Sequence, residues 1–597
     1  MPDYVNHELN VRFKHATPPN APIDSIEKLG ELIQNENKPE GGRKVKLYGG
    51  KHSFNHILKN GENDYLIDSK QIDGMQGIKP DATNLTVEIG GAVTLGEAIH
   101  KLSQHNLHLP IMGGWYSQTV AGLIATSTHG SSISDGSFSD YVEAVKVIGA
   151  DGKETNWISG NSDEMKAWRC NLGQLGIVTR IRFKVKKGFW LRVKTSEAMG
   201  DTEAFREIHE IHSKSVSNTS QPLINMMWIP YWDQCFIRTL HPTGKRERNK
   251  IARKLERKAF DKKTKELVMM HTRAIQAYDF GVGWSKGTLD AAGRFLYQYI
   301  LRGRFLKDDG AIAESFRIFL YGQYREAKAC QQLRMVNNVE YAVDGLKLFD
   351  IFKRMKRALL DQKRSGNVLN YPRVHIRFTN EKNLTLIGLN QGRRTAYIGT
   401  YFGGVVDADG KGGNAAIAED FEQIISEAGG RPHWGKYRYS DDDKFLEEYP
   451  HWDTFQRLRD EMDPNNVFSD GGANMFHKLD PFVDHDKIAE IVAARTDPRK
   501  IDPDWFPIPL YLLGNSESDD LPYGPHKTQS AGDAIKALKK SQEELDKEMK
   551  AAEKERAKRE ERRKKKEEKA AAEKKKKQER AKKKEARKKK KAAKKKP

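Results

Sequence analysis

The sequence predicts an α+β fold with more than one domain. Short strands and single helices alternate with glycine-rich joints between residues 40 and 190, a pattern typical of a mixed sheet-and-helix unit. The chain has 597 residues, so two or three domains and a large core are expected. The N-terminus is polar and no apolar run reaches about 18 residues, so we expect neither a secretory signal nor a membrane span.

Local patterns predict the elements of the first half. Helices are expected at Ser25–Asn35, where Ser25 is a candidate N-cap, at Thr94–Asn106, whose apolar residues share one face, and at Ser162–Asn171. Alternating or glycine-bounded apolar runs predict the strands, which are Lys44–Tyr48, Leu66–Ile67, Leu85–Ile89, Tyr141–Ile148 and Gly176–Val185.

Beyond Gly188 the sequence becomes more basic. Gly244–Lys265 is expected to be a helix with a solvated face, and Asp420–Ala428 a helix ended by two glycines. Alternation predicts further sheet strands at Val374–Phe378, Leu384–Leu389 and Thr395–Tyr401. Residues 480–530 are rich in Pro and Asp and are expected to form an extended segment that wraps the protein.

The positive charge is concentrated in a C-terminal tail of low complexity. The whole chain has a net charge of +21, and Ser541–Pro597 holds 28 Lys and Arg residues against 13 Asp and Glu, a net of +15. Residues 531–597 have no apolar seam, so they are expected to be disordered or a solvated helix. Such a tail favours contact with nucleic acid or an anionic membrane surface, or serves only to keep the chain soluble.

A glycine-rich stretch from Gly113 to Ser132 is the strongest candidate for a binding loop. Its glycines permit sharp turns and close approach to a ligand, and successive backbone N–H groups in such a loop can hold phosphate oxygens. Val120, Leu123 and Ile124 are expected to be one buried turn that anchors it. A plain Gly/Ser surface loop is the alternative. The candidate ligand-binding residues are Gly113, Gly114, Ser117, Thr119, Gly122, Thr126, Thr128, His129 and Gly130.

Two other short clusters combine glycine with chemistry-bearing side chains. The first ends a predicted strand and comprises Gly49, Gly50, Lys51, His52 and Ser53. The second is G-G-R-P-H-W-G-K at residues 429–436, where two cations, an imidazole and an indole lie between glycines and suit an anion or a developing negative charge. Taken singly, a structural turn histidine and a polar surface turn are the alternatives.

Several familiar sites are excluded. The chain has no G-x-x-x-x-G-K-[ST] phosphate loop, no G-x-G-x-x-G after a strand, no H-E-x-x-H and no G-x-S-x-G. The histidines and cysteines lack metal-ligand spacing, so no metal site is predicted. The three cysteines are far apart, which predicts no disulfide framework and an intracellular, reducing compartment.

The ordered set of motifs resembles a known family. V-A-G-x-x-A-T-S-T-H-G follows the Gly-Gly-x-His-Ser cluster, then come G-x-L-G-I-V-T, R-P-H-W-G-K and D-P-N-N-V-F. Over roughly residues 20–480 this order is similar to that of flavoproteins of the vanillyl-alcohol-oxidase (PCMH) type, in the sugar-lactone oxidase branch. That branch includes L-gulonolactone oxidase, D-arabinono-1,4-lactone oxidase and L-galactonolactone dehydrogenase.

The resemblance implies a bipartite FAD-binding domain and a cap domain with an antiparallel sheet flanked by helices. The FAD-binding domain would comprise residues 1–190 and a return at 429–480, with the cap at 191–428, a wrapping segment at 481–530 and the tail at 531–597. FAD would lie along the first glycine cluster and the 113–132 loop, and Gly176, Ile177 and Val178 would close its site from behind.

The resemblance also implies roles for individual residues. His52 matches the position of the covalent histidyl link to FAD, although Lys51 stands where the family has a small residue. Arg377 matches the arginine of the family's E-x-R-F element. Here the strand is V-H-I-R-F, so His375 replaces the glutamate and can either accept the substrate's hydroxyl proton or simply fill the pocket face. Lys436 matches the family's active-site lysine.

The implied reaction is oxidation of a CH–OH group of a gulono-, galactono- or arabinono-1,4-lactone by hydride transfer to flavin N5. Oxygen, giving hydrogen peroxide, or another acceptor would then take the electrons. An alditol or other alcohol is the alternative substrate, because His375 departs from the family pattern. A third alternative is a flavoprotein scaffold whose basic tail binds nucleic acid or an anionic surface, with a cytoplasmic, membrane-associated or nuclear location.

Overall fold

The computed structural model describes most of the chain up to residue 469. The described residues are 3–5, 11–19, 21–59, 61–196, 199–213, 223–253, 309–321, 336–365, 367, 369, 373–403, 413–439 and 444–469. The chain divides into two units, Met1–Leu521 and Pro522–Pro597, and every described residue belongs to the first. The predictions for residues 481–530 and for the basic tail lie outside the described residues.

The first half of the chain alternates short strands with short helices, as predicted. Its strands are β1 (Asp3–Val5), β2 (Arg12–Lys14), β3 (Val45–Tyr48), β4 (Tyr65–Asp68), β5 (Ile78–Asp81), β6 (Thr86–Gly90), β7 (Leu107–His108), β8 (Val142–Ile148), β9 (Ile158–Ser159), β10 (Ile177–Lys184) and β11 (Lys186–Lys187). Its helices are α1 (Ile26–Glu36), α2 (Leu95–Gln104), α3 (Val120–Ala125) and α4 (Asp163–Arg169), with 3-10 turns η1 (Ser69–Gln71) and η2 (Phe138–Tyr141).

Side-chain caps determine where the longer helices of this half begin. The Ser25 hydroxyl accepts the backbone N–H of Lys28 and starts α1, as predicted. Thr94 and Glu97 form a capping box at the start of α2, because each side chain accepts the other residue's backbone N–H. Both helices then bury one apolar face, which accounts for most of their stability.

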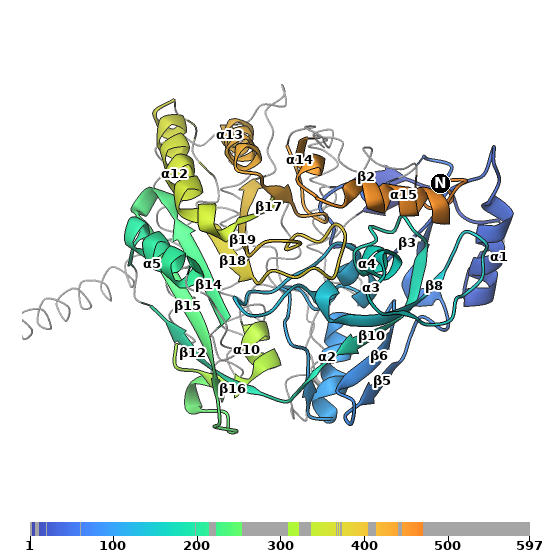
Figure 1. The fold of residues 1–597 in the computed structure, drawn as a ribbon, viewed down its shortest axis with the longest axis horizontal. Coiled ribbons are helices and arrows are strands. Elements are labelled where there is room, and N and C mark those ends of the chain that lie inside the picture. Colours follow the sequence, from blue (N-terminus) through green and yellow to red (C-terminus); the bar gives the residue numbers. More distant parts are fainter. Residues whose placement is uncertain are drawn as a thin grey trace, which may run out of the picture. The chain divides into compact units, whose positions relative to one another are not determined.

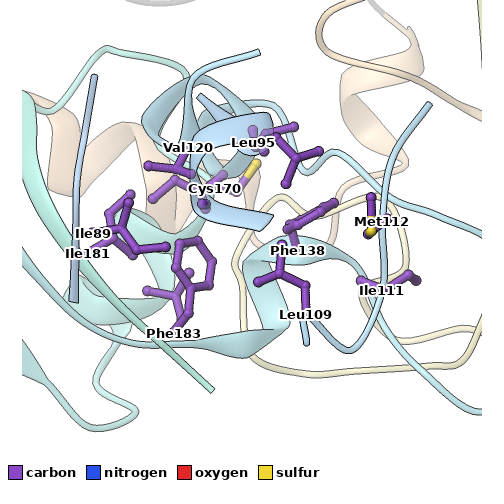
Figure 2. Close-up of a cluster of buried hydrophobic side chains, with 14 of the residues drawn as sticks. Ile89, Leu95, Leu109, Ile111, Met112, Val120, Phe138, Cys170, Ile181 and Phe183 are labelled. Carbon is purple, nitrogen blue, oxygen red and sulfur yellow. The ribbon is translucent and has the colours of Figure 1, made fainter. Parts of the chain in front are cut away.

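A five-stranded antiparallel sheet with the order β5-β6-β10-β8-β9 forms the base of this half. The helix α3 lies against it and buries Val120, Leu123 and Ile124, which confirms the predicted anchoring turn. Figure 2 shows Val120 in the same apolar cluster as Ile89 and Ile181 of the sheet. The glycine-rich segments on either side of α3 therefore start from a rigid support.

The second half is built around a nine-stranded sheet that is antiparallel throughout the described pairs. Its order is β16-β12-β15-β14-β18-β19-β17-β20, and β13 pairs with β15. The strands are β12 (Trp190–Thr195), β13 (Met199–Gly200), β14 (Leu223–Ile229), β15 (Gln234–Thr243), β16 (Ile312–Glu314), β17 (Val336–Asp344), β18 (Val374–Thr379), β19 (Thr395–Gly403) and β20 (Arg431–Pro432). The helical elements are α5 (Asp201–Ser213), η3 (Pro230–Trp232), α10 (Ser315–Tyr321), η5 (Gly345–Lys347), α12 (Leu348–Arg364), α13 (Gly413–Glu427), α14 (Lys444–Glu447) and α15 (Trp452–Met462).

Alternation along the sheet's strands divides it into two faces. Ile376 and Phe378 of β18 lie in an apolar cluster with Phe205 of α5, Phe352 of α12 and Phe421 of α13, so these helices cover one face. Residues of opposite parity face the first half of the chain. In Figure 1 the blue and cyan elements of the first half lie on the right and the green and yellow strands lie on the left, while the orange helix α15 returns to pack beside α4.

One predicted element of this half is wrong, and two helices have different starts from those expected. Leu384–Leu389 forms a loop rather than a strand, although Leu386, Ile387 and Leu389 are buried. Its carbonyls are bonded by side chains instead of by a neighbouring strand, since Trp434 donates to Ile387 and Arg431 to Leu389. The helix expected from Gly244 begins only at Lys250, and its continuation past residue 253 lies outside the described residues. The helix expected at Asp420 begins earlier and ends, as predicted, before a left-handed glycine.

Two further predictions concern the cysteines and the membrane. Cys170 and Cys235 are buried and are not joined to one another, and Cys330 lies outside the described residues. In the described part of the chain, no helix combines the length and the apolar character that a bilayer crossing needs.

Candidate functional site

A cavity of about 490 Å³ lies between the two halves and is lined by segments that are far apart in the sequence. This volume is within the usual range of cofactor and ligand sites. One wall is the turn after β3, a second is the loop around α3, and a third is the inner face of the large sheet together with residues 433–436. The three glycine-containing clusters of the sequence therefore meet in one cavity.

The turn after β3 presents His52 to the cavity. Lys51 has a left-handed backbone (φ 58°), and its ammonium group lies 4.5 Å from the centre of the Tyr48 ring. The imidazole of His52 stacks beside Trp115, and its Nε2 lies 2.6 Å from the hydroxyl of Ser117. The long lysine side chain is thus directed to an aromatic ring, while the histidine is positioned by the second wall.

Hydrogen bonds connect this turn to the C-terminal cluster. The backbone N–H of Phe54 donates to Gly435 (2.9 Å), and the Asn55 side chain donates to the carbonyl of Trp434 (2.6 Å). The ammonium group of Lys436 lies 4.7 Å from the centre of the Phe54 ring. His52 and Lys436 are separated by nearly 400 positions, but these bonds connect the two walls that carry them.

The loop around α3 is connected to the large sheet in the same way. The N–H of Ser132 donates to Phe378 of β18 (2.7 Å), and the Ser131 hydroxyl donates to Ile224 of β14 and accepts from the N–H of Phe378. These bonds hold the end of the glycine loop against two strands of the sheet, so the cavity has a defined width.

The glycines of the cavity wall show where a ligand fits. At Gly49 a Cβ would meet the Thr119 hydroxyl at 2.2 Å, and at Gly50 it would meet the Ser117 carbonyl at 2.3 Å, so two segments pack directly against these glycines. At Gly114 and Gly173 a Cβ would have no atom within 4 Å, although both glycines line the cavity. An extended cofactor fits this combination of a tightly packed support and an open face.

The structure brings nearly all of the predicted site residues together. Lining the cavity are Gly49, Gly50, Lys51, His52, Ser53, Gly113, Gly114, Thr119, Gly122, Thr126, Thr128, His129, Gly130, Gly176, Ile177, Val178, His375, Arg377 and Lys436. Ser117 does not line it and instead contacts His52 from behind.

The inner face of the sheet carries several polar side chains whose positions follow from the strand register. Strand register places Met227, His375, Gly399 and Glu340 in one row across β14, β18, β19 and β17. Arg377 lies two residues after His375 on β18, so its side chain is on the same face of the sheet. The wall opposite the glycine loops thus carries both an imidazole and a guanidinium group.

Glu340 and Arg377 form an ion pair at this wall, and only 3% of the Glu340 side chain is exposed. Burial by itself raises the pKa of the Glu340 carboxyl, but the neighbouring cations Arg377 and Lys436 outweigh it, so this pKa lies well below its ordinary value. The described cluster therefore combines two cations with one carboxylate at neutral pH.

Two buried histidines flank this carboxylate. Burial lowers the pKa of both His129 and His433, so both imidazoles are neutral near pH 7. His129 donates from Nδ1 to Gly130 (2.9 Å), which leaves Nε2 as its unprotonated nitrogen. His433 accepts the Gly435 N–H at Nδ1 (3.0 Å), so its proton is on Nε2.

The sequence analysis missed Glu340 and assigned no role to His433. Asn338 and Glu340 are polar residues at alternate positions of β17, and that alternation was an available signal for a strand with one polar face. Their place in the cavity was not readable, because it depends on a pairing between β17 and β19 across some 60 positions.

The fold and the cavity define an FAD-binding flavoprotein of the PCMH type. The structure resembles cholesterol oxidase from B. sterolicum with a TM-score of 0.61 and 14% identity, over 79% of this chain and 95% of that one. A family model described as FAD binding domain matches residues 28–156.

Within that class, the comparisons support the sugar-lactone oxidase family and an FAD-dependent oxidoreductase acting on CH–OH donors. The model for D-arabinono-1,4-lactone oxidase matches residues 181–477. The chain is 22% identical to L-gulono-1,4-lactone dehydrogenase of Mycobacterium tuberculosis, over 72% of this chain and 89% of that protein. It is 24% identical to L-gulonolactone oxidase of Mus musculus, over 75% and 91%. An alditol oxidase of Streptomyces is 31% identical over 138 residues, 23% of this chain and 32% of that protein.

Proposed function

We propose that this protein oxidises a CH–OH group of a gulono-, galactono- or arabinono-1,4-lactone, with FAD as the hydride acceptor and oxygen as the final acceptor. The observation that carries the proposal is the single cavity in which the His52 turn, the α3 loop, Arg377 and Lys436 converge. The names of the relatives supply the class of substrate.

In this proposal the two glycine-rich walls hold the cofactor. Gly114 and Gly173 leave open space along one side, and Gly49 lets the turn after β3 pack directly on Thr119. Bound FAD would supply the redox chemistry of this site, as the acceptor of the hydride and the source of the two electrons that, with two protons, convert oxygen to hydrogen peroxide.

The inner face of the large sheet and Lys436 bind the substrate. Arg377 and Lys436 supply N–H donors for the sugar oxygens and positive charge where negative charge develops. His375 accepts the proton of the hydroxyl whose carbon loses the hydride, because a neutral imidazole is a suitable base near pH 7. Two electrons and one proton leave the carbon as the hydride, and the hydroxyl proton leaves separately.

His52 is proposed as the point of covalent attachment. Its imidazole stacks beside Trp115 and its Nε2 lies 2.6 Å from the Ser117 hydroxyl, so the ring is held at the cavity wall. Intact mass after denaturation is the direct test, since a covalent link adds the mass of FAD to the chain. In His52→Ala that increment should disappear, whereas a control variant Ser53→Ala should retain it. An increment that persists in His52→Ala would place the link elsewhere.

The substrate is tested by anaerobic mixing with a panel of 1,4-lactones and alditols. Bleaching of the flavin absorbance by a lactone, followed by oxygen consumption on re-aeration, is the expected result. Preferential bleaching by alditols would favour the second candidate, an alditol oxidase, which His375 in place of the family's glutamate supports. Purified protein without flavin absorbance would contradict both.

A further inference from the structure

Glu340 is the only carboxylate among the described residues that line the cavity. It is almost fully buried, on a strand two places away from the strand of Arg377 in the sheet. The mechanism proposed above uses Arg377, His375 and Lys436 and leaves this carboxylate without a role. Burying a charged group costs free energy unless the group is paired, so the partner of Glu340 indicates what this carboxylate does.

The side chain of Glu340 reaches its partner by leaning over a glycine. Strand register places Gly399 of β19 directly between Glu340 of β17 and His375 of β18. A Cβ at Gly399 would lie 3.3 Å from Glu340 Oε1 and 3.6 Å from its Cγ and Cδ, so even a methyl group would press on the carboxylate. The missing side chain at residue 399 leaves the passage through which Glu340 meets the Arg377 guanidinium.

The surroundings of the carboxylate identify its chemistry. The donor atoms of His129, Glu340 and His433 lie within 4.8 Å of one another, a spacing that would suit a metal ion. However, His433 Nδ1 accepts a backbone N–H, so its Nε2 keeps a proton and offers no lone pair. In addition, the Glu340 carboxylate already accepts a hydrogen bond from the Arg377 guanidinium. The cluster is therefore a charge network and not a set of metal ligands.

We propose that Glu340 is a positioning residue of this site: it fixes the Arg377 guanidinium and sets how much positive charge the wall presents to flavin and substrate. Without the carboxylate, Arg377 and Lys436 would act as two uncompensated cations and Arg377 would lose its anchor. With it, the trio of Arg377, Lys436 and Glu340 carries a single net positive charge and keeps an oriented donor group. This inference rests on the proposed function, because it assumes that flavin and substrate share this cavity.

The test compares Glu340→Gln and Glu340→Asp with a matched control. Glu422 is also 3% exposed and bonds the hydroxyl of Tyr341, the residue next to Glu340, on the other face of the sheet. Glu422→Gln therefore removes a buried carboxylate that contacts β17 but does not line the cavity. For each protein, the flavin midpoint potential is measured by dye equilibration, and KM and kcat are measured separately.

Glu340→Gln should shift the flavin potential to more positive values, because the reduced flavin anion then faces more positive charge. It should also lower kcat/KM by about tenfold or more, equivalent to one lost buried interaction, and Glu340→Asp should recover part of the loss. Glu422→Gln should lower the unfolding midpoint but leave potential and KM unchanged. Equal potentials and KM values in Glu340→Gln and wild type, or equal shifts in Glu422→Gln, would overturn the inference.

A second variant covers the case in which Glu340→Gln does not fold. Gly399→Ala retains every charge but displaces the carboxylate, so KM should rise while the potential stays close to that of wild type. An unchanged KM in Gly399→Ala would overturn the inference. Wild-type protein that binds no flavin would overturn the proposed function and this inference together. If the wild-type protein binds flavin but lactones do not reduce it, only the substrate assignment would be contradicted. The flavin midpoint potentials would still decide the role of Glu340.

Discussion

Two glycines in the cavity wall predict opposite outcomes for the same substitution to alanine. At Gly49 the added Cβ would lie 2.2, 2.6 and 2.9 Å from Oγ1, Cγ2 and Cβ of Thr119, all closer than a normal contact. At Gly114 the added Cβ would have no protein atom within 4 Å. Gly49→Ala therefore tests packing, and Gly114→Ala tests whether the open space belongs to a cofactor.

The expected magnitudes follow from these distances. Thr119 is buried and its backbone precedes α3, so Gly49→Ala must shift a supported segment and should cost about 1–3 kcal/mol of unfolding free energy. Gly114→Ala should leave the unfolding free energy within about 0.5 kcal/mol of wild type. It should instead reduce the flavin bound per chain, and Gly114→Leu should reduce it further.

The assay uses two measurements on each variant. Urea denaturation followed by fluorescence reports the unfolding free energy, and flavin absorbance per chain after denaturation reports cofactor load. Thr119→Ala in the Gly49→Ala background should restore part of the stability, because it removes the two nearest atoms. Full flavin load in Gly114→Leu would refute the position of the cofactor, and an unchanged midpoint in Gly49→Ala would refute the packing argument.

Two further predictions concern stability. Arg431→Met should lower the unfolding free energy by about 3–5 kcal/mol, since the buried guanidinium donates to the carbonyls of Glu448, Leu389 and Gln391, and a urea midpoint equal to wild type would contradict this. Acid should also destabilise the fold. Burial lowers the pKa of His108 to about 4 and also lowers those of His129 and His433, so below pH 6.5 the unfolded chain takes up protons that the folded chain does not. The unfolding free energy should therefore fall by up to about 1.4 kcal/mol per pH unit for each imidazole, and His108→Asn should make the slope shallower.

Local sequence was a good guide wherever an element is defined by its own side chains. The caps at Ser25 and Thr94 need only a hydroxyl and the next turn of backbone, so the starts of α1 and α2 could be predicted closely. The turn at Val120 was predictable for the same reason, because its apolar spacing is a property of six consecutive residues.

Prediction failed where a segment is defined by distant partners. The run Leu384–Leu389 has the composition of a strand, but it is a largely buried loop, and Arg431 and Trp434 bond its carbonyls in place of a neighbouring strand. Glu340 could not be predicted as a site residue, because its position in the cavity depends on the pairing that places Gly399 of β19 beside it.

The sequence by itself determined the mixed α+β architecture, the flavoprotein family and a set of site residues nearly all of which line the cavity, because glycine, histidine and cation clusters keep a fixed order along the chain. Only the tertiary structure decided which of these residues touch: that His52 is braced by Ser117, that Phe54 bonds Gly435, and that Glu340 reaches Arg377 over a glycine. The physical reason is that hydrogen bonds and ion pairs act over a few ångströms, whereas the residues they join here are separated by tens to hundreds of positions.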